Sequence, residues 1–338
     1  MEYRRLGRSG VTVSSLCLGT MMFGGWGTKD HEESIRIIHR ALDAGINFID
    51  TADVYSAGES EVIVGKALAG GRRDDVVLAS KMGLPMGQDP NQRGSSRRWI
   101  IREVENTLRR LGTDYLDLYQ VHRYDPDTDL DVTLGALSDL VRAGKVRYIG
   151  HSTWPVSAIV EAQWTARDRG RERFITEQPP YSILNRAIEV DLLPTCARYG
   201  MGVLSYAPLC GGWLSGRYRA GSSAQPPHAA MRPASRFDMS LPVNQRKLEA
   251  AGQLADLADK AEITLIAMAI AFVLRHPATT SAIIGPRTMG HLESQLSAAG
   301  TVLSDDVLDR IDEIVPPGIT LDPSESNRPA PHAGARRR

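Results

Sequence analysis

The sequence predicts an α/β protein: a (β/α)8 barrel (TIM barrel) with an N-terminal β-hairpin and an extra C-terminal helix. Three observations predict it. Short β-rich runs alternate with helical patterns through eight strand–helix units. No Gly-x-Gly-x-x-Gly follows the first strand, although an open dinucleotide-binding sheet usually carries one. Chemically capable polar residues fall at the C-terminal ends of different strands, which is where a barrel builds its active site.

The eight units follow one another without a linker. The predicted strands are residues 14–20, 47–51, 76–81, 116–122, 146–152, 174–178, 201–207 and 281–285. The helices predicted to follow them are residues 31–45, 58–69, 96–111, 130–144, 156–169, 187–199, 245–262 and 289–298. Apolar residues recur at helical spacing, as at Ile101, Val104, Leu108 and Leu111, so each helix presents one face to the core.

Four segments lie outside this pattern. Residues 3–6 and 11–16 flank an Arg-Ser-Gly turn, which predicts a hairpin at the barrel floor. Residues 208–242 are rich in Gly, Ser and Pro, and a loop of this length is usually functional, often a lid. Residues 305–315 predict the extra helix. We therefore expect one domain over residues 1–315 and a loosely ordered tail over residues 316–338.

Composition excludes several classes of protein. Lys and Arg together number 40, as do Asp and Glu, so nothing suggests a nucleic-acid partner. The three cysteines, Cys17, Cys196 and Cys210, are widely spaced, so we expect neither a disulfide framework nor a metal site. The apolar run 264–274 is too short for a bilayer and predicts a buried helix. The N-terminal segment MEYRRLGRSG is charged and lacks the apolar run of a signal peptide, so we expect a cytoplasmic protein without membrane contact.

Four side chains at or just beyond strand ends make a coherent catalytic set: Asp50, Tyr55, Lys81 and His122. A phenol alone transfers protons poorly at neutral pH, and an ammonium beside it should lower its pKa. The carboxylate would keep Lys81 charged and oriented, while the imidazole would position a substrate carbonyl. A proton delivered to a carbonyl oxygen is useful if a hydride attacks the carbon, which requires a nicotinamide.

Several long motifs resemble the aldo-keto reductase superfamily, in particular the branch with sugar and aldehyde reductases and potassium-channel β subunits. These motifs are MEYRRLGRSG at residues 1–10, CLGTM at 17–21, FIDTADVY at 48–55, RRLGTDYLDLY at 109–119 and GKVRYIG at 144–150. The resemblance spans roughly residues 1–315. It implies NADPH-dependent reduction of an aldehyde or ketone to an alcohol, with Tyr55 as general acid, Lys81 and Asp50 tuning it, and His122 orienting the carbonyl.

The resemblance also carries over the NADPH contacts by motif. The expected contacts to the nicotinamide half are Gly19, Thr20, Met21, Asp50, Ser152, Gln178 and Tyr206. Those expected along the pyrophosphate and adenosine are Pro208, Leu209, Gly212, Leu214, Gly216, Arg217, Gly285, Arg287, His291 and Gln295. Arg287 would pair with the 2′-phosphate, which favours NADPH. The sequence departs from the family pattern at Thr153, Ala207, His291 and Ser294–Gln295, which bears on single cofactor contacts.

The substrate side is expected at Trp26, Tyr55, His122, Arg123 and Trp154, in and beside the strand-end loops. A small-molecule carbonyl is the expected partner, with a homo-oligomer possible. Two other functions stay open. One is a cofactor-binding regulatory or redox-sensing subunit with little turnover, against which the lack of a long N-terminal extension speaks. The other is a dedicated keto-deoxysugar reductase. A metal-dependent hydrolase is disfavoured, since the sequence holds no His-x-His.

Overall fold

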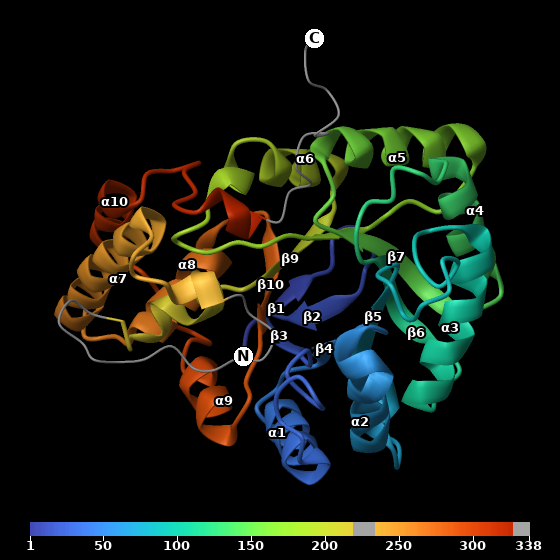
Figure 1. The fold of residues 1–338 in the computed structure, drawn as a ribbon, viewed down its shortest axis with the longest axis horizontal. Helices are drawn as coiled ribbons and strands as arrows, with labels where there is room; N and C mark the ends of the chain where they lie inside the picture. The colour runs from blue at the N-terminus through green and yellow to red at the C-terminus, as the bar shows by residue number, and fades with distance from the viewer. Residues whose placement is uncertain (219–233, 327–338) are drawn as a thin grey trace.

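A closed barrel of eight parallel strands forms the centre of the molecule in the computed structural model, which describes residues 1–218 and 234–326. The strands pair in the order β10-β3-β4-β5-β6-β7-β8-β9, so each strand lies beside the next in sequence and the last closes on the first. Figure 1 shows the helices as a ring outside this barrel. The predicted (β/α)8 fold is confirmed.

The strands are short and almost wholly buried. Their bounds are β3 Leu16–Gly19, β4 Phe48–Asp50, β5 Val77–Met82, β6 Leu116–Val121, β7 Val146–Ser152, β8 Thr176–Gln178, β9 Gly202–Tyr206 and β10 Thr279–Ile284. Alternate side chains point inward, and Cys17, Phe48, Leu118 and Leu204 pack together inside the barrel. The larger apolar core fills the space between the strands and the ring of helices.

Several of the helices have recognisable caps at their ends. Their bounds are α1 His31–Asp43, α2 Glu59–Leu68, α3 Arg97–Leu111, α4 Leu130–Arg142, α5 Val156–Arg169, α6 Leu192–Tyr199, α7 Pro242–Lys260, α8 Leu265–Arg275, α9 Met289–Leu296 and α10 Asp305–Ile314. Asp30 caps α1 by accepting the backbone N–H groups of Glu32 and Glu33. Gly112 and Gly170 end α3 and α5 in the left-handed conformation.

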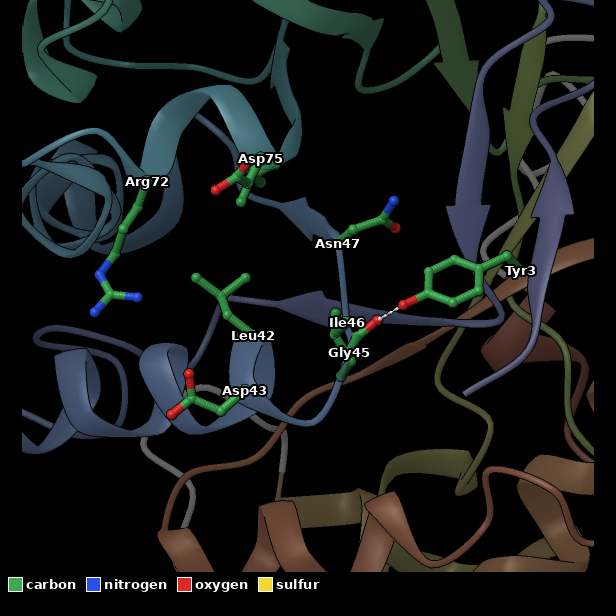
Figure 2. A pocket seen from close by; sticks show the side chains of 9 residues that line it. Tyr3, Leu42, Asp43, Gly45, Ile46, Asn47, Arg72 and Asp75 are labelled. Carbon is green, nitrogen blue, oxygen red and sulfur yellow. Dashed lines mark hydrogen bonds between the residues drawn. The ribbon is translucent and has the colours of Figure 1, made fainter.

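The N-terminal hairpin closes the floor of the barrel, as predicted. Strands β1 (Tyr3–Arg5) and β2 (Thr12–Ser14) pair antiparallel, and Leu6 and Val13 cap the inner core. The turn requires a glycine at position 7, where φ is +56° and a Cβ would stand 2.8 Å from the carbonyl oxygen of Gly200. A pocket of about 260 Å³ at this same end is lined by Tyr3, Asn47 and Val76, among others. Figure 2 shows the side chains of Tyr3 and Asn47 at this pocket.

Helices α7 and α8 both lie between β9 and β10, as predicted, but α8 is the one that packs on β10. The sequence assigned residues 245–262 to the seventh strand–helix unit and 264–274 to a buried helix. In the structure α8 packs directly on β10, while α7 packs on α8 and α10. The reason is the distribution of apolar residues: α8 is buried along most of its length and needs cover on both sides, whereas α7 buries one face.

Residues 316–326 are held more firmly than the loose tail that we expected. The Leu321 N–H donates to the Leu184 carbonyl oxygen at 3.1 Å, and the Arg186 N–H donates to that of Ile319 at 3.0 Å. The buried Lys247 of α7 donates to Asp322 at 2.8 Å. The described residues of the segment expected as a lid, 208–218 and 234–242, include two 3-10 helices, η4 (Cys210–Ser215) and η5 (Ala234–Phe237). Its residues 219–233, and residues 327–338 of the tail, lie outside the described residues.

No helix in the described parts of the chain is long and apolar enough to cross a membrane.

Candidate active site

Three of the predicted catalytic residues form one buried chain of hydrogen bonds. Lys81, the fifth residue of β5, donates from Nζ to Asp50 Oδ1 at 2.5 Å, to the Thr51 carbonyl oxygen at 2.9 Å and to Tyr55 Oη at 3.0 Å. Lys81 is fully buried and Asp50 nearly so. Three acceptors satisfy all three ammonium protons, so the phenol oxygen is fixed at the end of a charged chain.

The second oxygen of Asp50 is held by two glutamines. Gln178 Nε2 donates to Asp50 Oδ2 at 2.9 Å, and Gln120 Nε2 donates to it at 3.1 Å. Gln178 was predicted from the sequence, but Gln120 was missed. The available signal was strand alternation, because Gln120 lies two residues before His122 and therefore on the same face of the strand.

His122 directly follows β6, and its ring lies beside the phenol. The two ring centroids are 5.8 Å apart and nearly perpendicular. Within the described residues, the buried Nδ1 of His122 has no hydrogen-bond partner. Burial lowers the pKa of His122 far below its usual range, and the charges of Lys81 and Arg123 lower it further. The imidazole is therefore neutral at pH 7 and retains hydrogen-bonding capacity for a ligand.

The pKa of Tyr55 moves opposite to the expectation that Lys81 would lower it. Burial raises the pKa of the phenol above its usual value, and the opposing effect of Lys81 is smaller. For Lys81 itself, burial lowers the pKa, but the Asp50 carboxylate and Tyr55 outweigh it and raise the pKa overall. Tyr55 is thus a neutral phenol beside a permanently charged ammonium.

Backbone strain is concentrated around this group. Ser56 and Ala57, directly after Tyr55, have φ of 50° and 57°. Thr153 and Ala207, directly after β7 and β9, have φ of 57° and 56°. Left-handed φ is uncommon for residues other than glycine and persists where the surrounding structure enforces it. The chain therefore turns sharply at the ends of these strands and beside the phenol.

The residues predicted for the nicotinamide half surround this centre. Ser152 and Gln178 end adjacent strands, and Ser152 Oγ donates to the Gln178 carbonyl oxygen at 2.9 Å. Tyr206 ends β9, with its hydroxyl 3.4 Å from Thr153 Oγ1. Gly19 ends β3, where a Cβ would lie 2.6 Å from the Ile283 side chain. The Thr20 hydroxyl donates to the Asp50 carbonyl oxygen at 3.2 Å, whereas Met21 is exposed.

The residues predicted for the rest of the cofactor lie on two neighbouring loops. Pro208, Leu209, Gly212, Leu214 and Gly216 lie in or beside η4, after β9. Gly285 and Arg287 follow β10, while His291 and the buried Gln295 lie on α9. Arg217 contacts His291 across the two loops, with 3.5 Å between their nitrogens. At Gly212, Gly216 and Gly285 a Cβ would meet nothing within 4 Å, so the backbone there faces open space.

The predicted substrate residues differ in position. Trp26 lies near the phenol, with ring centroids 6.1 Å apart, and its backbone N–H donates to Ser56 Oγ. Arg123 donates to the His122 carbonyl oxygen at 2.7 Å and to Ser152 Oγ at 3.3 Å. Trp154 is only 3% exposed and stacks on His151, 4.8 Å away, behind the strand ends. The structure therefore brings Trp26 and Arg123 to the centre and buries Trp154 beside it.

Comparison with known proteins agrees with this geometry. Residues 15–316 match the aldo/keto reductase family. The uncharacterized oxidoreductase YrpG of Bacillus subtilis is 39% identical, over 94% of this chain and 96% of that protein. The aldo-keto reductase YhdN of Bacillus subtilis is 36% identical over 90% of both chains. A probable voltage-gated potassium channel subunit beta of Arabidopsis thaliana is 32% identical, over 93% of this chain and 97% of that protein.

Proposed function

The chain belongs to the aldo/keto reductase family, and on that basis we propose that it reduces an aldehyde or ketone to an alcohol with NADPH. The observation that carries the proposal is the Asp50–Lys81–Tyr55 chain beside a neutral His122. This arrangement offers a proton donor and a hydrogen-bonding imidazole on one side of a carbonyl group.

The protein's own residues account for the acid half of the reaction. Tyr55 holds its proton at neutral pH and passes it to the carbonyl oxygen as negative charge develops there. Lys81, 3.0 Å from the phenol oxygen, stabilises the phenolate that remains. Asp50 keeps the ammonium in place, and His122 directs the carbonyl toward Tyr55. When bound, the nicotinamide supplies the hydride.

NADPH fits the residues present along the barrel mouth. Ser152 and Gln178 offer a hydroxyl and an amide for the carboxamide, and Tyr206 a ring for stacking. The open backbone at Gly212 and Gly216 suits a pyrophosphate, because glycine allows close approach. Arg217, Arg287 and His291 form a cluster of basic residues that suits the 2′-phosphate and favours NADPH over NADH.

The remaining parts of the proposal rest on the sequence. The family match supports a small-molecule carbonyl as substrate, the even charge balance gives no sign of a nucleic-acid partner, and the free cysteines support the cytoplasm as the compartment. We also propose that residues 1–315 act as one catalytic domain.

Fluorescence titration with NADPH and NADH, followed by nicotinamide absorbance with an aromatic aldehyde, tests the function. We expect tighter binding of NADPH and steady oxidation on addition of the aldehyde. Failure to bind either nucleotide would contradict the proposal. Tighter binding of NADH would contradict only the role of Arg287 and its neighbours.

A second candidate is a cofactor-binding regulatory subunit, which the identity to a probable potassium channel β subunit favours. The same titration separates the two functions. A regulatory subunit would bind NADPH tightly but turn over very slowly with aldehydes of several shapes. A reductase oxidises bound NADPH in many successive turnovers.

A further inference from the structure

A buried carboxylate lies directly behind the proposed nicotinamide site. Glu177 precedes Gln178 on β8 and points to the opposite face of the strand, where it is fully buried. Its Oε1 accepts the Thr153 N–H at 2.8 Å and the Trp154 N–H at 3.3 Å. Its Oε2 accepts a short hydrogen bond from His151 Nδ1. Three donors thus converge on one carboxylate from the adjacent strand β7 and the turn that follows it.

The two backbone donors belong to the turn that ends β7. Thr153 has φ of 57°, a conformation that β-branched residues rarely adopt. The Glu177 carboxylate binds the N–H groups on both sides of the Thr153 α-carbon, and so fixes the peptide planes that define this turn. His151 is held between Glu177 and the rings of Trp154 and Phe174, whose centroids are each 4.8 Å from that of the imidazole, so the third donor to the carboxylate is fixed by packing.

The turn sets the positions of the residues that face the barrel mouth. Ser152, immediately before it, donates to the Gln178 carbonyl oxygen, and so does the Thr153 N–H, at 3.2 Å. Gln178 in turn donates to Asp50. The Thr153 hydroxyl lies 3.4 Å from that of Tyr206. The turn is therefore linked by hydrogen bonds to Ser152, Gln178 and Tyr206.

We infer that Glu177 is a positioning residue for the nicotinamide half of the cofactor, acting through the strained turn at Thr153. The inference rests on the proposed function, because Ser152, Gln178 and Tyr206 are the groups that would bind the nicotinamide. The residues proposed for the adenosine half lie elsewhere, after β10 and on α9. Glu177 therefore affects one end of the cofactor and leaves the other unchanged.

The substitution Glu177→Gln tests the inference, because it keeps the shape and replaces one acceptor oxygen by a donor. An amide at this position faces three donors, but only its oxygen can accept a hydrogen bond, because its NH2 group is itself a donor. We expect the Kd of NADPH to rise about tenfold, since hydrogen bonds to a charged group are lost. The Kd of adenosine 2′,5′-bisphosphate, which lacks the nicotinamide, should change by less than about twofold.

Glu103→Gln is the matched control. Glu103 is another buried carboxylate, on α3, and it accepts from Arg110 at 2.6 Å and from Asn106 at 2.8 Å. Its substitution should leave the ratio of the two Kd values as in the wild type. If Glu177→Gln does not fold, Glu177→Asp, which keeps the charge and shortens the side chain, allows the same comparison.

Three outcomes are distinguishable. Weaker binding of NADPH alone supports the positioning role. Equal weakening of both ligands, or of neither, overturns it and leaves Glu177 a purely structural residue. If the wild type binds adenosine 2′,5′-bisphosphate and NADPH equally well, no nicotinamide contact contributes, and the proposed function itself fails at that site.

Discussion

At the scale of single residues, Tyr55 shows how two opposing effects set a proton's affinity. Burial disfavours the phenolate, and the Lys81 ammonium 3.0 Å away favours it, with burial the larger effect. A donor of this kind holds its proton throughout the neutral range. The ammonium becomes useful mainly when charge develops during the reaction, which is when stabilisation accelerates the chemistry.

Removing the phenol hydroxyl should separate chemistry from binding. We expect Tyr55→Phe to lower kcat by about 10²- to 10⁴-fold, the usual contribution of a general acid. The Kd of NADPH should stay near that of the wild type, because Lys81 keeps its bonds to Asp50 and Thr51. Single-turnover absorbance and fluorescence titration measure the two quantities. A variant that keeps most of its turnover would show that another group donates the proton.

The pKa shifts also predict the pH profile of reduction. Reduction requires a neutral His122 and a protonated Tyr55. Activity should therefore fall at low pH, below the lowered pKa of His122, and at high pH, above the raised pKa of Tyr55. We expect kcat/KM to be flat between about pH 6.5 and 10, the two unperturbed values. Initial rates in a series of overlapping buffers measure this. A fall centred between pH 7 and 9 would mean that Lys81 outweighs burial after all.

The proposed catalytic residues could be picked out of the sequence because each lies at or near the C-terminal end of a predicted strand, and those ends meet at one mouth of a barrel. The sequence pattern missed Gln120 and Glu177, since a residue inside a strand reads as core until its neighbours are known. It also gave the wrong direction for Tyr55. The net shift depends on how much water remains around the phenol, and spacing along the chain carries no such information.

At the scale of elements, residues 316–326, which follow α10, connect to η4 through Glu325. We call this segment the strap. Glu325 accepts from Lys247 Nζ at 3.0 Å and from Cys210 Sγ at 2.7 Å, and it lies 3.5 Å from Arg236. Lys247 also lies over the Trp213 ring, 5.2 Å away. One side chain thus joins the C-terminal segment to α7, to η5 and to the loop proposed for the pyrophosphate.

Loosening this strap should speed cofactor release. Glu325→Gln removes the charge that pairs with the buried Lys247, and we expect NADPH to dissociate about three- to tenfold faster. The free energy of unfolding should fall by about 2 kcal/mol, less than for a fully buried pair because Glu325 is partly exposed. Stopped-flow displacement and thermal unfolding measure the two effects.

Glu313→Gln provides the control for the strap, since Glu313 pairs with Arg310 on the exposed face of α10. It should change neither the release rate nor the stability appreciably. A Glu325 variant that is less stable but releases NADPH at the wild-type rate would show that the segment only stabilises the fold.

Element order was readable from hydrophobic periodicity, whereas the layer in which an element lies was not. The sequences of α7 and α8 both show the apolar spacing of a helix. Which of the two packs on β10 depends on the other helices that cover it, and the spacing does not reveal this. The polar residues 316–326 looked loose for a similar reason. Their partners, such as Leu184 and Lys247, are distant in sequence, and local composition does not reveal such contacts.

At the scale of the whole molecule, one side of the barrel buries three carboxyl groups near one arginine side chain. Asp53, Glu61 and Glu103 are all buried next to Arg110, which donates to Glu61 at 2.5 Å and to Glu103 at 2.6 Å. Asp53 Oδ2 has no hydrogen-bond partner within the described residues. Burial raises the pKa of Asp53 well above its usual value, and the nearby carboxylates Glu61 and Glu103 raise it further.

Stability should consequently depend on pH through Asp53. Its folded-state pKa exceeds its unfolded-state value of 3.8, so between the two the folded state binds more protons. Stability from this group is therefore present at low pH and lost as pH rises, by up to about 1.4 kcal/mol per pH unit. Asn cannot ionise and resembles the protonated acid, so Asp53→Asn should be more stable than the wild type at pH 7.

The advantage of Asp53→Asn should shrink as the pH falls and vanish near pH 3, where Asp53 is protonated in both states. Denaturant unfolding of both proteins at several pH values measures it. Asp74→Asn, at an exposed position, is the control and should stay within about 0.5 kcal/mol of the wild type throughout. An Asp53 variant less stable than the wild type at pH 7 would show that the folded protein requires an ionised carboxylate there. Arg110 would then have to balance three negative charges, and the excess acid of the barrel would be compensated by groups farther away.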